Sequence, residues 1–525
     1  MKIYLRSLLR TCFLALLLAL LLSLFFNKPI LLTDAAAQSS IPNSVEQAIK
    51  RSGIPKESIS IAVTEIPSTT NPMPAARTIM NWRDDIAMNP ASTIKLLTTL
   101  VALDILGPKY RWKTELFTDG AIKKGILKGN IYFVGQGDPK WIPEELSELT
   151  KKLRNLGIQQ INGNLIFDRG AYTKQVMEDT TIDGETLRAY NVSPDPLLYA
   201  FRTLSFEINL NKNSDIANIV YTPKLARFKI DNQLKVISSP CNNPKNNIRF
   251  EIIPNPNEIN TSQLNNKSAI QWRAVFTGEI SRYCKNLSFN VVKFDPDTFL
   301  TLGFTAAWEE AGGKWSRPPN GQAGSVPIYA RPLLSYEGLT LLDASQDINK
   351  LSNNVMARQV FLTLGLEKMG KPTDITSSEK VIHAWLNQRG LQFPELIIEN
   401  GSGLSRNEAI SARNLNKLLI SGQELPISDV FLSTLPLVGS EGTVRHRLIN
   451  QMRNFLHLKK KPEARIKTGS LDNVRSISGY VFSKSGRIYA VTSFINDPKA
   501  NRGQEIHDQL LTWLLEDGPE PKEAR

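Results

Sequence analysis

The sequence has few of the residue types from which metal sites and disulfide frameworks are built. Its 525 residues include only three cysteines and four histidines. No H-E-x-x-H pair occurs, and no histidine lies near a pair of cysteines, which argues against the common zinc sites. We therefore expect neither a metal ion nor another cofactor.

Low-complexity segments, internal repeats and recognisable nucleic-acid-binding motifs are also absent from the sequence. Hydrophobic residues make up 41% and charged residues 22%, as in ordinary globular proteins, and the length allows two to four domains. The formal net charge of +13 would suit a nucleic-acid-binding protein. Without a supporting motif, however, we do not expect nucleic acid as a partner.

Long hydrophobic runs are missing except at the N-terminus. Three basic residues precede the apolar run Cys12–Phe26, and the small-residue triplet Ala35-Ala36-Ala37 follows it. This layout predicts that residues 1–37 are a cleaved secretory signal peptide. The alternative is an uncleaved membrane anchor, because the run approaches the length of a spanning helix. Either interpretation places the rest of the chain outside the cytoplasm, for example in a periplasm.

Export changes how the charge and the cysteines are interpreted. Residues 1–37 hold four basic side chains and one acidic, so their removal lowers the formal charge from +13 to +10. The acidic partners outside a membrane are lipid head groups and cell-wall polymers, although the charge also fits a plain solvated surface. If lipid head groups are the partner, the protein would associate peripherally with the membrane. With Cys12 removed, we expect Cys241 and Cys284 to form a structural disulfide.

The pattern of elements predicts one α/β domain whose two halves bracket a β-rich block. A helix is expected from Asn89 to Leu106, where Gly107-Pro108 ends it, and the last 200 residues alternate helices with strands. The block between them includes a predicted strand over residues 160–168. It also holds an Asn- and Lys-rich segment over about 206–289, and residues 317–326 are expected to form a linker.

A serine and a lysine three residues apart open the first of these helices. Residues i and i+3 share one helix face, so Ser92 and Lys95 can meet. Asn89 suits the N-cap and Pro90 the first helical position, which would place Ser92 in a turn that favours negative charge. A lysine in a dry pocket beside another cation can act as a base toward a serine hydroxyl.

This S-x-x-K pattern is weak evidence when it stands alone. The chain contains a second match, Ser377–Lys380 (SSEK), for which we expect a helix-capping role. A second element is S-x-N, Ser352-Asn353-Asn354, which also has other matches in the chain. The third is Lys467-Thr468-Gly469, the only K-T-G, ahead of predicted C-terminal strands. The three motifs in this order are typical of penicillin-binding proteins and class A β-lactamases.

With these motifs the chain resembles the penicillin-binding protein 4 type of D-alanyl-D-alanine carboxypeptidase/endopeptidase, a serine peptidase family. The gap of 260 residues between Ser92 and Ser352 matches the extra domains of that family. Asn400 stands where the family commonly has aspartate, and Ser470 where it commonly has threonine. The resemblance rests on these segments: Asn89–Leu97, Gly135–Pro139 (GQGDP), Asn400–Arg406 (NGSGLSR), Leu435–Arg447 and Arg465–Gly479.

The resemblance implies an α/β (α+β) fold of the serine β-lactamase/DD-peptidase-like transpeptidase type, with a β-rich two-part insertion between the first two motifs. The expected catalytic domain comprises residues 38–120 and 325–525. A first inserted domain would comprise 121–205 and 290–324, with a second, nested β-rich domain at 206–289.

The resemblance also implies a role for each motif residue. Ser92 would be the acylated nucleophile, Lys95 its base, and Ser352 a proton relay to the leaving D-alanine, polarised by Lys467. Asn354 would hold the substrate amide carbonyl. The K-T-G strand would bind the terminal carboxylate through Lys467, Thr468 and the hydroxyl of Ser470, with Gly469 leaving the strand edge open. The N–H groups of Ser92 and Ser470 would form the oxyanion hole.

The implied substrates are peptidoglycan stem peptides ending in D-Ala-D-Ala, with β-lactam antibiotics acylating the same serine. A serine β-lactamase is one alternative, opposed by the long insertion and by the lack of an E-x-x-x-N motif between S-x-N and K-T-G. A catalytically silent wall-binding protein of the same fold is another. The sequence leaves the choice between carboxypeptidase and endopeptidase open.

Overall fold

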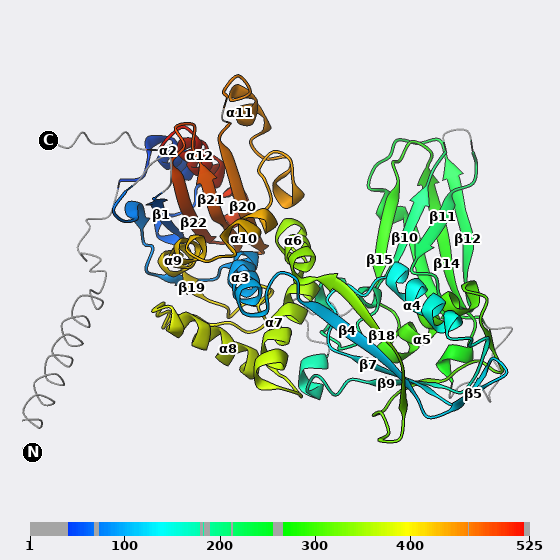
Figure 1. Ribbon diagram of the computed structural model, residues 1–525. Helices are drawn as coiled ribbons and strands as arrows, with labels where there is room; N and C mark the ends of the chain where they lie inside the picture. The colour runs from blue at the N-terminus through cyan, green and yellow to red at the C-terminus, as the bar shows by residue number, and fades with distance from the viewer. Residues whose placement is uncertain are drawn as a thin grey trace, which may run out of the picture. The chain divides into compact units, whose positions relative to one another are not determined.

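The structure is a computed structural model that describes residues 40–67, 73–178, 182, 189–211, 214–255, 266–459 and 461–518 (Figure 1). The chain divides into two units, Met1–Ser40 and Ile41–Arg525, and the second is described below. The predicted signal peptide therefore lies outside the described residues. Within those residues, no helix combines the length and apolar character that crossing a bilayer requires.

An antiparallel sheet of five strands joins the beginning of the second unit to its end. The strand order is β2-β1-β22-β21-β20. Strand β1 pairs with β22 along its whole length, from Ile59 opposite Ile495 to Ile66 opposite Ile488. Nearly every residue of β1 is buried, which indicates cover on both faces of the sheet. The strands are β1 (Ile59–Ile66), β2 (Arg77–Trp82), β20 (Glu463–Leu471), β21 (Val474–Phe482) and β22 (Ile488–Asn496).

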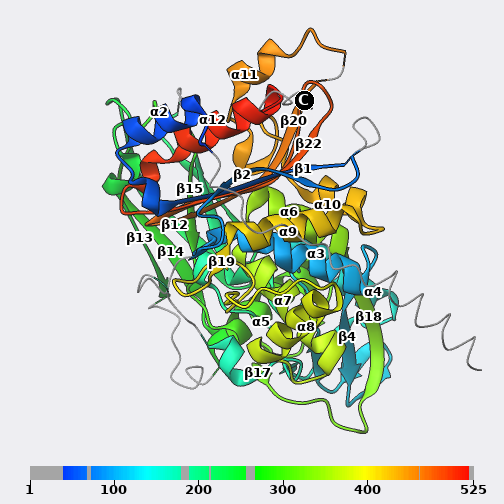
Figure 2. The ribbon, with the colours of Figure 1, turned by 90° about the vertical axis from the view of Figure 1, so that its left-hand side faces the viewer.

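Helices supply that cover, and Figure 2 shows them on either side of the sheet. Helices α2 (Asn43–Ser52) and α12 (Gln504–Leu515) pack together on one face. On the other face lie α9 (Ala412–Gln423) and α3 (Lys95–Leu106), which belong to a separate apolar core. The sheet is thus the middle layer of a three-layer α/β/α arrangement.

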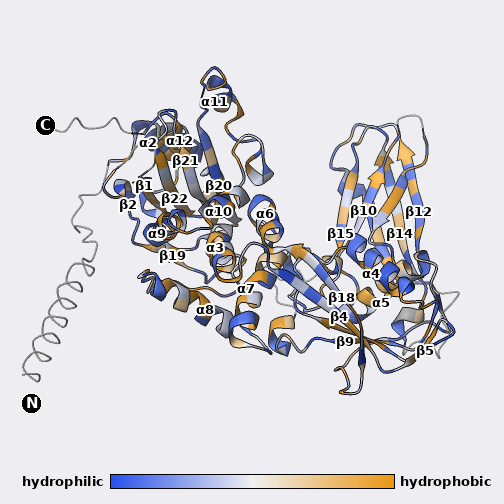
Figure 3. Cartoon of the chain, viewed as in Figure 1, coloured by the Kyte–Doolittle hydropathy of each residue, from blue (hydrophilic) through white to orange (hydrophobic). Residues whose placement is uncertain are grey.

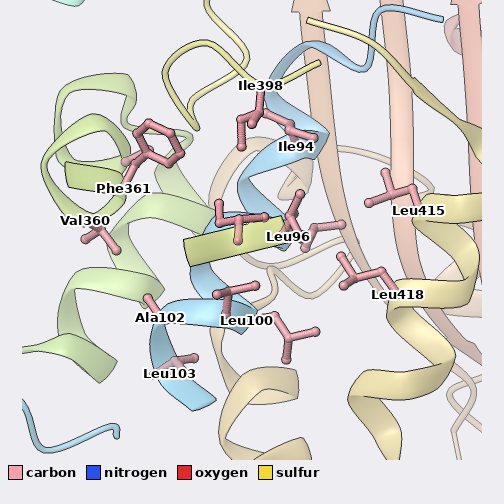
Figure 4. Close-up of a cluster of buried hydrophobic side chains, with 14 of the residues drawn as sticks. Ile94, Leu96, Leu100, Ala102, Leu103, Val360, Phe361, Ile398, Leu415 and Leu418 are labelled. Atoms are coloured by element: carbon pink, nitrogen blue, oxygen red, sulfur yellow. The ribbon is translucent and has the colours of Figure 1, made fainter. Parts of the chain in front are cut away.

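Helix α3 is the centre of the second core. Figure 4 shows Leu96 and Leu100 of this helix between Phe361 on one side and Leu415 and Leu418 on the other. All residues from Lys95 to Leu103 are buried, so the helix is enclosed on every side. The surrounding helices are α6 (Leu341–Leu351), α7 (Asn354–Met369), α8 (Ile375–Gln388), α9 and α10 (Ser428–Thr434).

Two further sheets and two α-helices are inserted between α3 and α6, around an apolar core that they share with the Asn- and Lys-rich segment. One sheet has the order β17-β9-β7-β4-β18 and the other β16-β8-β6-β5. The elements are β4 (Arg111–Thr118), β5 (Ala121–Lys123), β6 (Ile126–Lys128), β7 (Ile131–Gly135), α4 (Pro143–Asn155), β8 (Gln160–Asn162), β9 (Leu165–Asp168), α5 (Pro296–Glu310), β16 (Lys314–Trp315), β17 (Gly321–Ala323) and β18 (Arg331–Thr340).

The Asn- and Lys-rich segment forms two three-stranded sheets, ordered β11-β10-β15 and β12-β14-β13. Apolar side chains alternate with polar ones along these strands, as the banded colouring in Figure 3 shows. A disulfide joins Cys241 and Cys284, with 5.0 Å between their Cα atoms. The strands are β10 (Leu204–Asn209), β11 (Asn218–Thr222), β12 (Phe228–Ile237), β13 (Ile248–Pro254), β14 (Trp272–Ser281) and β15 (Leu287–Val291).

Two predictions about the inserted block were wrong in detail. The single strand expected over 160–168 is divided into β8 and β9 at Gly163, where a Cβ atom would lie 1.9 Å from the carbonyl oxygen of Gly129. The expected linker 317–326 contains β17, which pairs in parallel with β9. Both departures depend on partner strands that are distant in the sequence, and local composition does not reveal such partners.

Candidate active site

Ser92 lies in a single 3-10 turn, Ala91–Ile94, that runs directly into α3. The side chain of Asn89 accepts a hydrogen bond from the N–H of Ala91 at 2.9 Å and donates to the carbonyl of Ser405 at 2.9 Å. The N–H of Asn89 donates to Asn496 at the end of β22. Asn89 therefore anchors the turn as expected of a cap, but the first turn is 3-10 rather than α-helical.

The side-chain nitrogen of Lys95 lies at the centre of a small hydrogen-bond network. Its Nζ is 2.8 Å from Ser92 Oγ and 2.7 Å from Asn354 Oδ1, and it also contacts the carbonyl oxygen of Ser402. A carbonyl oxygen and an amide oxygen can only accept. A neutral Lys95 would direct two N–H groups at these two acceptors, which leaves its lone pair for the Ser92 hydroxyl.

The surroundings of Lys95 favour this neutral form. The side chain is fully buried, and burial lowers the pKa of Lys95 well below its ordinary value. The charge of Lys467 lowers this pKa further, while the charge of Glu408 raises it. Ser92 itself is only half-buried, so the nucleophile is accessible while its neighbouring amine is dry.

Ser352 and Lys467 form a second pair of hydroxyl and amine. Ser352 ends α6 with a left-handed backbone, φ 59°, and its Oγ accepts a hydrogen bond from Lys467 Nζ at 2.8 Å. The same Nζ donates to the carbonyl of Thr468 at 2.6 Å. Lys467 is buried, and burial lowers its pKa to about 7.

Strand β20 places the K-T-G motif directly against the nucleophile turn. A Cβ atom on Gly469 would lie 2.8 Å from Pro90 O and 2.9 Å from Ser92 N, so only glycine allows this approach. Thr468 Oγ1 is 2.9 Å from the hydroxyl of Thr443. Ser470 follows on the strand, exposed, and its side chain makes no hydrogen bond within the described part of the chain.

A loop over residues 399–405 closes the other side of the turn. Asn400 Oδ1 accepts hydrogen bonds from the N–H and hydroxyl of Ser402. Gly403 has φ +80°, and a Cβ atom there would lie 2.0 Å from Ala91 O. From the sequence, this segment was identified only through the family resemblance. Ser402 acts through its backbone carbonyl, a group that no side-chain pattern can reveal.

The structure therefore brings together three segments of the chain: the one with Ser92 and Lys95, the one with Ser352 and Asn354, and the K-T-G strand. A cavity of about 440 Å³ adjoins the S-x-N segment. The second S-x-x-K match does not have the expected capping role, because the side chain of Asp374, not Ser377, caps α8. Among the described residues no cluster of His, Cys, Asp and Glu could hold a metal ion.

The fold is that of the serine, penicillin-recognising DD-peptidases. The profile of the D-Ala-D-Ala carboxypeptidase 3 (S13) family matches residues 43–516, and the chain belongs to that family. Its inserted block and its α/β domain have the fold that the sequence resemblance implied.

Several named proteins are similar to this chain. D-alanyl-D-alanine carboxypeptidase DacB of Haemophilus influenzae is 24% identical over 80% of this chain and 82% of its own length. D-alanyl-D-alanine carboxypeptidase of Actinomadura sp. is 24% identical over 76% and 72%, respectively. The crystal structure of penicillin binding protein 4 (dacB) from Haemophilus influenzae aligns with a TM-score of 0.65 at 21% identity, covering 90% of this chain and all of that chain.

Proposed function

We propose that this protein removes the terminal D-alanine from peptidoglycan peptides ending in D-Ala-D-Ala, through an acyl intermediate on Ser92. The contact of 2.8 Å between Lys95 Nζ and Ser92 Oγ carries the proposal, because it joins a nucleophile to a dry, pKa-lowered amine. Membership of the D-Ala-D-Ala carboxypeptidase family supports the substrate class.

Acylation begins when Ser92 Oγ attacks the carbonyl carbon of the D-Ala–D-Ala bond and its proton passes to Lys95 Nζ. The N–H groups of Ser92 and Ser470 stabilise the oxyanion. Ser352 gives its hydroxyl proton to the leaving nitrogen and is reprotonated from Lys467, to which it is hydrogen-bonded. The carbon–nitrogen bond breaks and D-alanine leaves.

Deacylation uses Lys95 as the base a second time. Before this step Lys95 releases to solvent the proton that it took from Ser92, and Lys467 takes up a proton in place of the one it gave to Ser352. Water then attacks the acyl carbon while the neutral Lys95 accepts its proton, and the ester bond to Ser92 breaks. The shortened peptide then leaves with a new carboxyl group, and the proton returns to Ser92 Oγ. A β-lactam would acylate Ser92 by the first step, with its ring amide bond opening in place of the peptide bond.

Substrate binding follows from the donors that the network leaves free. Asn354 Oδ1 accepts from Lys95, so its amide N–H groups can donate to the substrate's amide carbonyl. Lys467, Thr468 and Ser470 along β20 would bind the terminal carboxylate.

Covalent labelling with a fluorescent penicillin tests the nucleophile. We expect the parent protein to be labelled and Ser92→Ala to lose both labelling and D-alanine release, by at least about a thousandfold. Ser377→Ala, in the other S-x-x-K match, is the matched control and should label like the parent. An unlabelled parent would favour the silent wall-binding alternative, and rapid turnover of the penicillin would favour the β-lactamase.

The product identifies the peptidase type. Mass spectrometry of purified muropeptides after incubation should show the loss of one alanine from pentapeptides, as a carboxypeptidase produces. Conversion of cross-linked dimers to monomers would identify a DD-endopeptidase instead.

We further propose that the protein is exported and works outside the cytoplasm, in a periplasm or at its membrane surface. The charge and apolar pattern of residues 1–37 and the Cys241–Cys284 disulfide support this proposal. Cell fractionation with a salt wash distinguishes a free protein from one attached to the membrane.

A further inference from the structure

A carboxyl group that no motif explains is buried behind the nucleophile. Glu408 is 1% exposed. Its Oε1 accepts hydrogen bonds from the backbone N–H of Glu399 at 3.2 Å and of Asn400 at 3.1 Å. Its Oε2 is buried and has no hydrogen-bond partner within the described residues. An incompletely paired carboxyl group inside a protein is costly, which calls for a compensating role.

The N–H groups that Glu408 binds belong to the first residues of the loop that contacts Lys95. Directly after them, the carbonyl of Gly401 accepts a hydrogen bond from Thr98 Oγ1 at 2.7 Å, and the carbonyl of Ser402 contacts Lys95 Nζ. Both acceptors lie on the same side of α3 as the nucleophile. Glu408 therefore holds the backbone that fixes the direction of the Lys95 amine.

Charged groups from three other segments act on this carboxyl group. Burial is the main influence on the pKa of Glu408 and raises it. The charge of Glu399 on the loop also raises this pKa, whereas the charge of Lys95 on α3 lowers it. Arg358, one turn into α7 from Asn354, is also buried. Burial lowers the pKa of Arg358, and the charge of Glu408 opposes that effect. The charge of Lys467 on β20 lowers the pKa of Lys95.

We propose that Glu408 is a positioning residue for Lys95, which holds the Ser402 carbonyl against the amine and supplies the negative charge opposite Lys95 and Arg358. This inference rests on the proposed role of Lys95 as the base for Ser92. Neither Glu408 nor Arg358 touches Ser92, yet both affect the pH below which Lys95 can no longer accept a proton. Glu408 moves this limit to higher pH and Arg358 moves it to lower pH.

The test is the rate of penicillin acylation as a function of pH. Glu408→Gln keeps an oxygen that can accept from Glu399 and Asn400 but removes the charge. The acid limb of the profile should therefore move to lower pH by about one unit. Arg358→Met removes a cation with little change in volume, so the acid limb should move to higher pH. Glu408→Ala also releases the loop, so its rate should fall at every pH.

Glu395 provides the matched control. It too accepts hydrogen bonds from a backbone N–H, that of Ser411 at 3.0 Å, and from Asn414 in the same domain. Glu395→Gln should leave the position of the acid limb unchanged.

A Glu408→Gln profile that superimposes on that of the parent would overturn the proposal, whatever its plateau rate. Should Glu408→Gln not fold, Arg358→Met decides, and an unshifted acid limb in that variant overturns it as well. A parent protein that is never acylated would instead overturn the proposed function on which the inference rests.

Discussion

At the scale of single residues, the candidate site depends on positions where a side chain would be in the way. Gly403 and Gly469 bring two different backbone segments against the same turn, at Ala91 and Ser92. Only Gly403 also has a left-handed backbone, φ +80°. The nucleophile is thus fixed by backbone contacts on both sides as well as by its hydrogen bond to Lys95.

We expect Gly403→Ala to slow penicillin acylation by about a hundredfold, because the new Cβ atom would displace Ala91 and misplace Ser92. Gly390→Ala is the control. Gly390 has φ +67°, but an added Cβ atom would meet nothing within 4 Å. That variant should lose about 1–2 kcal/mol of stability from the left-handed backbone alone and keep its acylation rate. Equal rates for the two variants would contradict the steric argument.

At the scale of elements, the sequence predicts those helices and strands whose limits are determined by the local residue pattern. The helix from Asn89 to Leu106 follows from its apolar residues and from the Gly107-Pro108 stop, and the structure ends α3 at Leu106. The expected strand over 160–168 failed at Gly163, where the backbone of Gly129, between β6 and β7, approaches closely. The predicted domain boundaries remain predictions.

The site divides in the same way between local and distant determinants. Ser92 and Lys95 meet because they are three residues apart on one helical segment, so the motif alone suffices. Asn354 lies 259 positions from Lys95, and its contact could be inferred only through the resemblance. The Ser402 carbonyl and Glu408 were missed, since neither a backbone group nor an isolated glutamate forms a pattern along the chain.

Helix α12 carries a buried titratable group that should make the protein sensitive to acid. His507 is 2% exposed, and burial, with smaller effects of Arg447 and Arg475, lowers its pKa to about 3. An unfolded histidine titrates near 6.5, so between these values only the unfolded chain binds the proton. Stability is fully present above pH 6.5 and is lost as pH falls toward 3, by about 2 kcal/mol at pH 5.

Urea unfolding at pH 7.5 and pH 5.0 tests this effect. In His507→Leu the loss of stability between the two pH values should be smaller by about 2 kcal/mol than in the parent. The half-buried His383 provides the control, and His383→Leu should leave the parent's pH dependence intact. The same pH dependence in His507→Leu as in the parent would show that the buried histidine does not contribute.

At the scale of the whole chain, the described residues form separate apolar cores. Two of them enclose the five-stranded sheet from opposite faces. A third contains residues from Leu116 to Tyr336 and includes the sheets that flank the disulfide. The residues of the candidate site belong to elements around the first two cores, and the disulfide lies beside the third. A small fourth core of Val192, Leu198, Val292 and Val355 connects the inserted block to α7. We expect the third core to be able to lose stability without altering the site residues.

The cysteine pair tests this separation. The disulfide joins residues 43 positions apart, so its removal should destabilise the inserted block by about 4 kcal/mol through the entropy of the unfolded chain. For Cys241→Ser/Cys284→Ser we expect an early calorimetric transition that is absent in the parent. Penicillin labelling measured between that transition and the next should equal that of the parent at the same temperature. A parallel loss of labelling would show that the two regions unfold as one.

The pairing of β1 with β22 has a consequence for the order of events during synthesis. Residues 59–66 are made among the first of the folded part, yet their partner strand, residues 488–496, is made among the last. Until then β1 has no partner on that edge, whereas the inserted block already has all its strands. The nascent chain should therefore acquire a folded insertion first and a competent nucleophile only near its completion.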